Sequence, residues 1–129
     1  MKNLYFILVI FSISVLDSCK TSNNSDFEVL EGEIISISCP EKAISGDNVD
    51  VIVQFRGMNG CSEGFTIKAN TVGQTVTLSA FYKQPLNTKY CNEISPVHTL
   101  TYSFFTDFAG VHFFQSAQNN SIADTLTVY

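Results

Sequence analysis

The strongest constraint on the fold of this 129-residue chain is a two-residue alternation of apolar and polar side chains that recurs after residue 29. In residues 49–55 every odd-numbered position is apolar, and Asp50 and Gln54 stand between them. Successive side chains of a β-strand point to opposite faces, so this alternation predicts a half-buried strand. No segment after residue 29 repeats apolar residues at helical spacing. The alternation therefore predicts an all-β domain.

The same pattern predicts seven short strands, each bounded by Gly, Pro, Asn or Asp residues that favour turns. They cover residues 30–39, 49–55, 65–69, 75–82, 99–104, 111–117 and 123–129. Turn signals recur every ten to fourteen residues along most of this length. Short strands at that spacing are typical of an antiparallel β-sandwich.

The start of the sixth expected strand and the body of the seventh carry a family resemblance. The sixth opens on Ala109-Gly110-Val111-His112, and the seventh contains Asp124-Thr125-Leu126-Thr127-Val128. This layout resembles the Ig-like domains of bacterial lipoproteins and surface proteins, in which Ala-Gly-x-Tyr opens the sixth strand. Here His112 stands where the tyrosine is usual. The resemblance implies an Ig-like sandwich of about seven strands over residues 28–129, and it implies no function.

The N-terminal residues have the composition of an export signal. Lys2 precedes a thirteen-residue apolar run at residues 4–16, which is short of the about 20 residues that cross a bilayer. Leu16-Asp17-Ser18-Cys19 resembles the lipobox of bacterial lipoproteins, although Asp17 departs from it. The resemblance implies that residues 1–18 are removed as a signal peptide and that Cys19 is acylated, for example with palmitate. An ordinary secretory signal that contains a cysteine is the alternative.

Lipidation would make residues 19–27 an acylated cysteine followed by a flexible, Asn/Ser-rich tether. Two or more acyl chains anchor a protein stably to a membrane. We therefore expect a lipid-anchored protein of the bacterial cell envelope, at the outer membrane. The residues do not choose between its periplasmic face and the cell surface.

The net charge of −5 narrows the classes of partner. It is unchanged when residues 1–18 are removed, because that segment contains one Lys and one Asp. An acidic chain without a basic cluster disfavours binding to nucleic acid and adsorption to anionic lipid. We expect no nucleic-acid partner and a protein or glycan ligand.

Three cysteines remain once Cys19 is assigned to the lipid. An exported chain permits disulfides, and three thiols form at most one bridge within the molecule. We favour Cys61–Cys91, because both residues lie in turn-rich stretches that a bridge would restrain. Such a bridge contributes about 3 to 4 kcal/mol through the entropy of the unfolded chain. Cys39 reads as a buried thiol, and the alternative bridges through Cys39 stay open.

The chain contains no recognised catalytic or cofactor motif. His98 and His112 begin two strands that run in opposite directions, which predicts that they lie about 15 to 20 Å apart and share no metal. Asp47 and Asp50, near Glu41, favour turn chemistry over a calcium site. We expect neither an enzyme, nor a cofactor, nor a metal site.

Two groups of residues are candidates for contact with a ligand. One surrounds the expected bridge. The other is aromatic: Phe104-Phe105 and Phe113-Phe114 are neighbours on strands, so one ring of each pair must leave the core. With Phe104 and Phe114 inside, Phe105, Val111 and Phe113 form an outward apolar group beside Phe108, unless a loop or the first strand covers it. The candidate ligand-facing residues are Arg56, Met58, Glu63, Lys89, Tyr90, Phe105 and Phe113.

These observations favour a membrane-anchored, non-catalytic binding or adhesion module. An inhibitor of an exported enzyme, presenting the loop at residues 56–63, is the first alternative. An enzyme with an unrecognised site is the second.

Overall fold

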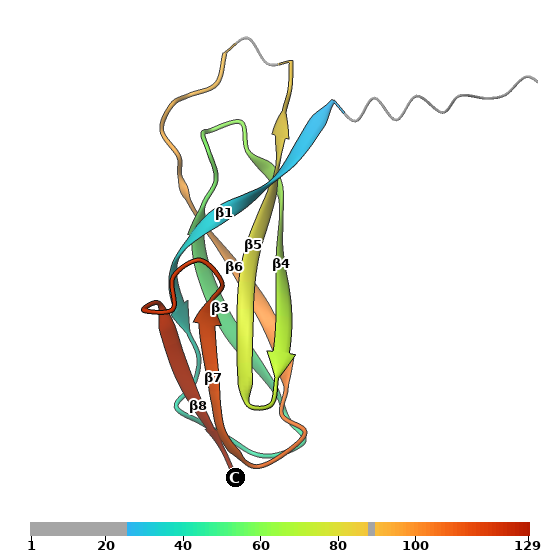
Figure 1. Cartoon of the computed structure of the whole chain (residues 1–129), viewed down its shortest axis with the longest axis vertical. Coiled ribbons are helices and arrows are strands. Elements are labelled where there is room, and N and C mark those ends of the chain that lie inside the picture. Colours follow the sequence, from blue (N-terminus) through green and yellow to red (C-terminus); the bar gives the residue numbers. More distant parts are fainter. Residues whose placement is uncertain (1–25, 88–89) are drawn as a thin grey trace, which may run out of the picture.

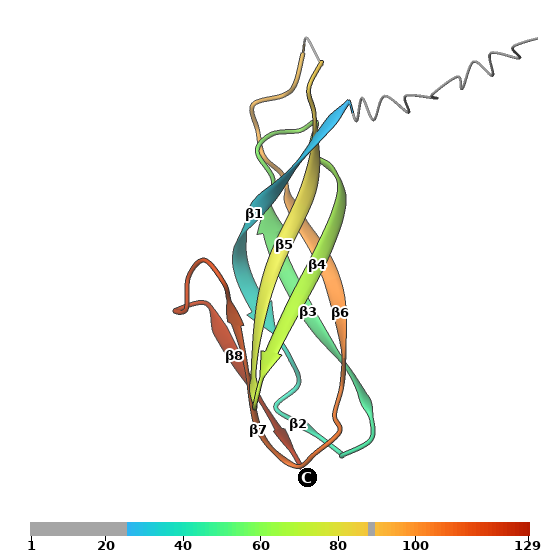
Figure 2. The same ribbon diagram turned by 45° about the vertical axis from the view of Figure 1, so that its right-hand side comes forward.

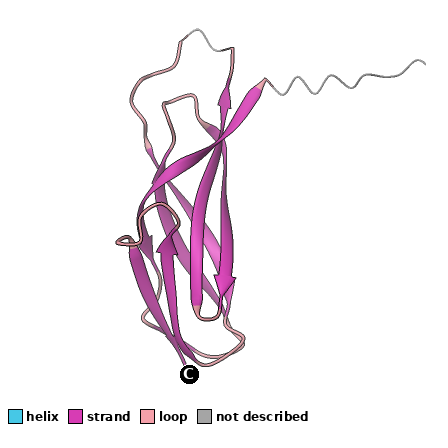
Figure 3. Cartoon of the chain, viewed as in Figure 1, coloured by secondary structure: helices cyan, strands magenta, loops and turns pink. Residues whose placement is uncertain are grey.

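The computed structural model describes residues 26–87 and 90–129, and all regular structure in this part of the chain is β-strand (Figure 3). The prediction of an all-β fold is confirmed. The strands are β1 (Phe27–Ser38), β2 (Lys42–Ala43), β3 (Asn48–Arg56), β4 (Glu63–Val72), β5 (Thr75–Pro85), β6 (Val97–Phe105), β7 (Gly110–Ser116) and β8 (Ala123–Val128).

Each of the seven expected strands is present, with ends that differ by a few residues. The strand that the sequence pattern missed is β2, which is two residues long and pairs in parallel with β8. Two residues are too few to show an alternation, so only the pairing with β8 reveals this strand.

The strands form one curled, mixed sheet in the order β2-β8-β7-β5-β1-β3-β6, with β4 on the other edge of β5 (Figures 1 and 2). The sheet has the form of a half-barrel. The expectation of an entirely antiparallel arrangement was wrong, since β5 pairs with β7 in parallel, as β2 does with β8. The chain reverses direction after β5 and again after β6, so β5 and β7 run the same way and are parallel as neighbours.

Strand β1 links two parts of the curled sheet, because it changes partner along its length. Its first half pairs with β5 and its second half with β3, with an irregularity between Ile34 and Ser36. Gly32 lies just before this change, where an added Cβ would stand 2.8 Å from the backbone oxygen of Arg56. A residue without a side chain lets the two backbones approach, and this close approach allows the sheet to fold over itself.

The core fills the inside of the curled sheet. In β3 every second side chain is buried and every other one is exposed, as the alternation predicted. Phe55, Leu78, Phe114 and Leu126 are fully buried and come from β3, β5, β7 and β8. Strands that are distant in sequence therefore share one core.

The two ends differ in their connections (Figure 1). The stapled end comprises residues 57–62 and the described part of 86–96, and Asp26 lies at the same end, where its oxygen accepts a hydrogen bond from the N–H of Leu86. The aromatic end comprises the β4–β5 turn at Gly73 and residues 104–112, and the C-terminus lies there. The lengths of β3, β5 and β6 separate these two ends.

Candidate functional site

A pocket of about 220 Å³ lies at the aromatic end. We call it the aromatic pocket. A cavity of about 150 Å³ holds benzene in a well-studied engineered protein, so this volume admits a small organic group. Its walls come from the β4–β5 hairpin, the end of β6, the β6–β7 connection and β7, and they consist of Thr71, Gly73, Phe104, Phe105, Asp107, Phe108 and His112.

The two neighbouring phenylalanines of β6 contribute in different ways. Phe104 is 7% exposed and packs edge-on against the core ring of Phe114, with ring centres 5.1 Å apart. Phe105 points to the opposite face and is 54% exposed. Phe104 therefore connects the pocket to the core, and Phe105 lies on the solvent-facing side of the pocket.

His112 is the most unusual residue of the pocket. It is buried, its ring stacks on Phe108, and its Nε2 lies 3.1 Å from the backbone oxygen of Phe108. A carbonyl oxygen only accepts, so Nε2 carries the proton of this bond, and Nδ1 of the neutral ring is an acceptor. Nδ1 is buried and has no hydrogen-bond partner among the described residues. Buried polar atoms without a partner are rare, and a functional role or a bound water or ion explains some of them.

The connection that carries Asp107 and Phe108 is held in place by Thr106. This residue is fully buried, and its Oγ1 lies 2.7 Å from the oxygen of Ile44 and 2.9 Å from that of Asp47. The hydroxyl has one hydrogen and donates it to one of these oxygens, while the N–H of Asp47 donates back to Oγ1. The 44–47 turn therefore clamps one wall of the pocket.

The stapled end contains the predicted bridge. Cys61 and Cys91 form a disulfide, with their Cα atoms 5.4 Å apart, so this pairing is confirmed. The N–H of Gly60 donates to the oxygen of Asn92 at 2.9 Å, and Ser95 Oγ donates to the oxygen of Gly57 at 2.6 Å. The two connections lie side by side, as the bridge predicted.

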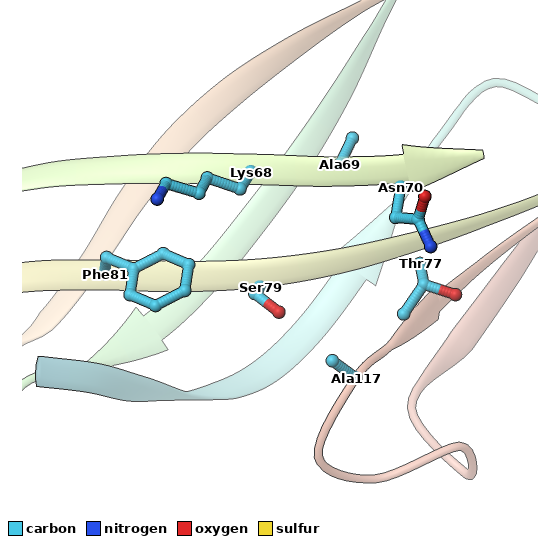
Figure 4. Close-up of a pocket in the computed structure, with 7 residues that line it drawn as sticks. All are labelled: Lys68, Ala69, Asn70, Thr77, Ser79, Phe81 and Ala117. Atoms are coloured by element: carbon cyan, nitrogen blue, oxygen red, sulfur yellow. The ribbon is translucent and has the colours of Figure 1, made fainter.

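A second, larger hollow lies on the outer face of β4 and β5, and we call it the outer groove (Figure 4). Its volume is about 440 Å³, and it is open to solvent. Lys68 Nζ lies 4.8 Å from the ring centre of Phe81 and so already has an aromatic partner. In the described part of the chain, the buried side-chain atoms without a partner belong to His98 and His112, and neither lines this groove. The groove thus lacks the unpaired buried group that the aromatic pocket has.

The candidate residues around the bridge are exposed and do not converge on either hollow. Tyr90 is 93% exposed, and Arg56, Met58 and Glu63 are also exposed. Neither the aromatic pocket nor the outer groove includes any of them. Lys89 lies outside the described residues.

The aromatic candidates are divided by the structure. Phe105, Phe108, Val111 and Phe113 are all about half exposed, which agrees with the expected directions of their side chains. Phe105 and Phe108 line the pocket, whereas Val111 and Phe113 do not. The alternation could place a ring inside or outside, but it could not show which outward rings share a cavity.

Sequence reasoning did not find the pocket as a unit. The expected strands leave Thr71 and Gly73 in one turn and Asp107 in another, which is distant in the sequence. The one available signal was the density of aromatic residues around that second turn, because His112 and its phenylalanine neighbours lie within nine residues.

His98 lies toward the stapled end of β6, opposite Phe55, and its ring centre is 3.8 Å from that of Phe65. His112 packs on Phe104, near the other end of β6. Six residues of β6 separate these positions, or about 20 Å at the rise of a strand, which agrees with the expected separation. Within residues 26–87 and 90–129, no group of three or more His, Cys, Asp or Glu is arranged to hold a metal ion.

Cys39 is a free thiol, which resolves the alternative bridges through it. Its N–H donates to Asp124 Oδ2 at 2.8 Å. Burial, and then the negative charge and hydrogen bond of Asp124, raise the pKa of Cys39 to about 12. The thiol therefore stays protonated at neutral pH, which makes it a poor nucleophile.

The segment on which the anchor prediction rests, residues 1–25 with Cys19, lies outside the described residues. In the part of the chain that is described, no helix is long and apolar enough to cross a bilayer. No protein-family model, no curated protein and no solved structure matches the chain.

Proposed function

We propose that this chain is an exported, lipid-anchored, non-catalytic binding module of the bacterial cell envelope, which takes its ligand in the aromatic pocket. The observation that carries the proposal is that the lining of this pocket includes His112, a buried side chain whose Nδ1 has no hydrogen-bond partner among the described residues. Leaving a buried acceptor without a partner costs about 1 to 3 kcal/mol. A ligand that donates a hydrogen bond there would recover this energy.

The position of Asp26, the first described residue, supports this choice of surface. Asp26 lies at the stapled end, where its backbone oxygen accepts a hydrogen bond from the N–H of Leu86. It follows Cys19 by seven residues, which span at most about 25 Å. The eleven residues of β5 extend about 35 Å from the aromatic end toward the stapled end. An anchor at Cys19 would keep the stapled end near the bilayer and turn the aromatic pocket away from it, toward a ligand in solution or on another surface.

The Ig-like form of the sandwich is part of the proposal. It is supported by β1, which pairs with β5 and then with β3 and so links two parts of the sheet across one core. Two sheets packed about 10 Å apart, as determined by crystallography, would support it. A sheet that closes into a barrel would contradict it.

The anchor is tested by Cys19→Ser. The variant should leave the membrane fraction and appear in the soluble fraction, because it lacks the thiol that is acylated. A Cys39→Ser variant is the matched control and should stay with the membrane. Continued membrane association of Cys19→Ser would overturn the anchored part of the proposal.

The binding site is tested by titrating the ¹⁵N-labelled protein with 1-butanol, n-butylammonium and butyrate while its amide resonances are recorded. At least one probe should shift the resonances of Gly73, Asp107 and His112 in a saturable way, and those of residues 57–62 should stay unchanged. If none of the three probes perturbs the aromatic end, the pocket is not a binding site and the proposal fails.

An inhibitor of an exported enzyme remains a second candidate, and one observation favours it. Tyr90 and Met58 are 93% and 59% exposed on connections that the disulfide holds together. An inhibitor of this kind would lose its effect on an exported hydrolase after Tyr90→Ala and keep it after Phe108→Leu. Loss of inhibition after Phe108→Leu, with inhibition kept after Tyr90→Ala, would instead support function at the aromatic pocket.

A further inference from the structure

We infer that the aromatic pocket recognises a primary alkylammonium group. This inference rests on the proposed function, because it names the class of ligand for the same pocket. It depends on three features of the lining: a carboxylate without a counter-ion, a set of aromatic rings, and an acceptor nitrogen without a donor.

The first feature is charge. Asp107 lines the pocket, and no Lys or Arg does. Across residues 26–87 and 90–129, no ion pair includes Asp107, so its charge is available to a ligand. The net charge of −5 adds a long-range attraction for cations at low ionic strength. Both the local and the overall charge favour a cation over an anion.

The second feature is the aromatic lining. Phe104, Phe105 and Phe108 line a pocket of about 220 Å³ together with His112. The face of an aromatic ring attracts a cation within about 6 Å of its centre, and the attraction grows when the cation loses water. The rings also bury the alkyl part of a ligand. A short alkyl chain with a cationic head therefore suits this lining better than a strongly hydrated ion.

The third feature selects among cations. His112 Nε2 is engaged with the oxygen of Phe108, which leaves Nδ1 as a buried acceptor. A primary ammonium group has three N–H donors and can supply one to Nδ1. A quaternary ammonium group has none, and a neutral alcohol offers a donor without a charge for Asp107. The complete set of interactions is available only to a cation that carries N–H groups.

The test compares probes of similar size by the same ¹⁵N titration. We expect n-butylammonium to bind at least about tenfold more tightly than 1-butanol and more tightly than tetramethylammonium, and we expect butyrate to bind least. Added salt should weaken the binding of n-butylammonium and leave the binding of 1-butanol unchanged, because only the binding of n-butylammonium depends on charge. Equal affinity for n-butylammonium and 1-butanol, or tighter binding of butyrate, would overturn the inference.

Variants locate the interaction. Asp107→Asn should lower the affinity for n-butylammonium about tenfold and leave the affinity for 1-butanol unchanged. Phe108→Leu should lower the affinity for both probes. Asp26→Asn, an exposed carboxylate at the stapled end, and Phe113→Leu, a half-exposed ring outside the pocket, are matched controls that should change neither affinity. Thermal unfolding of each variant shows whether it is folded. Unchanged n-butylammonium affinity in folded Asp107→Asn contradicts the inference.

The outcomes separate the inference from the function on which it rests. Equal binding of charged and neutral probes at the aromatic end rejects the ammonium specificity and leaves a binding pocket. No binding of any probe rejects both. N-acetyl-lysine methylamide distinguishes the sources of the group: tighter binding than n-butylammonium indicates a lysine side chain of a protein, and weaker binding indicates a free amine.

Discussion

The stapled end and the aromatic end both hold connections between strands in place, but by different chemistry. At the stapled end, the connection between β5 and β6 runs through residues 86–96, and the Cys61–Cys91 bridge ties it to residues 57–62. At the aromatic end, β6 and β7 are joined by four residues, and the buried hydroxyl of Thr106 holds them. A long connection loses more entropy on ordering than a short one, so a covalent bond is used where the connection is long.

Side-chain burial follows the same division. Met58, Leu86, Tyr90 and Ile94 at the stapled end are all more than half exposed. At the aromatic end, Phe104, Thr106 and His112 are buried, while Phe105 and Phe108 are about half exposed. The stapled end therefore gains little from apolar burial, and the disulfide compensates for this. The aromatic end has enough packing to stand without a bridge, and its rings surround a pocket.

The largest expected effect comes from removing the packing beneath the aromatic pocket. Phe114→Ala should lower the free energy of unfolding by about 3 to 5 kcal/mol, because this fully buried ring supports Phe104. Urea denaturation measures the loss, and Phe113→Ala, on the exposed face of the same strand, should cost far less. Similar losses for the two variants would show that the aromatic end is not held by core packing.

The next effect concerns the bridge. A Cys61→Ser, Cys91→Ser double variant should lose about 3 to 4 kcal/mol of unfolding free energy. Hydrogen exchange should accelerate in residues 57–62 and stay slow at His112, because the bridge acts at one end of the molecule. Equal acceleration at both ends would show that the two ends are not stabilised independently.

A smaller effect is expected for the hydroxyl that clamps the pocket wall. Thr106→Val keeps the shape of the side chain and removes its hydrogen bonds, which should cost about 1 to 3 kcal/mol. Thr101→Val, at an exposed position of β6, the strand that ends just before Thr106, should stay within about 0.5 kcal/mol. Amide exchange of Asp47 reports on the same hydrogen bond. If Thr106→Val leaves the free energy of unfolding unchanged, the Thr106 hydroxyl does not stabilise the aromatic end.

The smallest effect involves Cys39, which belongs to neither end. Its folded-state pKa of about 12 lies above the ordinary value of 9.0. Its contribution to stability is therefore complete below pH 9 and is lost as the pH rises toward 12. At pH 9, iodoacetamide should alkylate Cys39 at least about tenfold more slowly in the folded than in the unfolded protein. Asp124→Asn should lower the pKa and accelerate the reaction, and an unchanged rate would contradict the role of Asp124.

The strands and the bridge could be predicted because they depend on neighbouring residues. Val49 to Phe55 alternates with the period of a strand, and the exposure of β3 follows it residue by residue. Cys61 and Cys91 stand in connections that needed restraint, and their pairing followed from that position. The parallel pairing of β5 with β7 could not be predicted in this way, because alternation identifies a strand but not its neighbour. Acylation of Cys19 stays a prediction.

The sequence by itself determined the all-β class and the seven longer strands, showed that one ring of each adjacent phenylalanine pair leaves the core, and favoured the Cys61–Cys91 disulfide. Each depends on local periodicity or on the placement of a few residues near turns. Only the tertiary structure decided that the sheet curls, that Thr71, Phe105 and Asp107 meet around one cavity, and that His112 Nδ1 has no partner there. These features depend on contacts between segments that are distant in the chain. They follow from how the whole core packs, which no local pattern specifies.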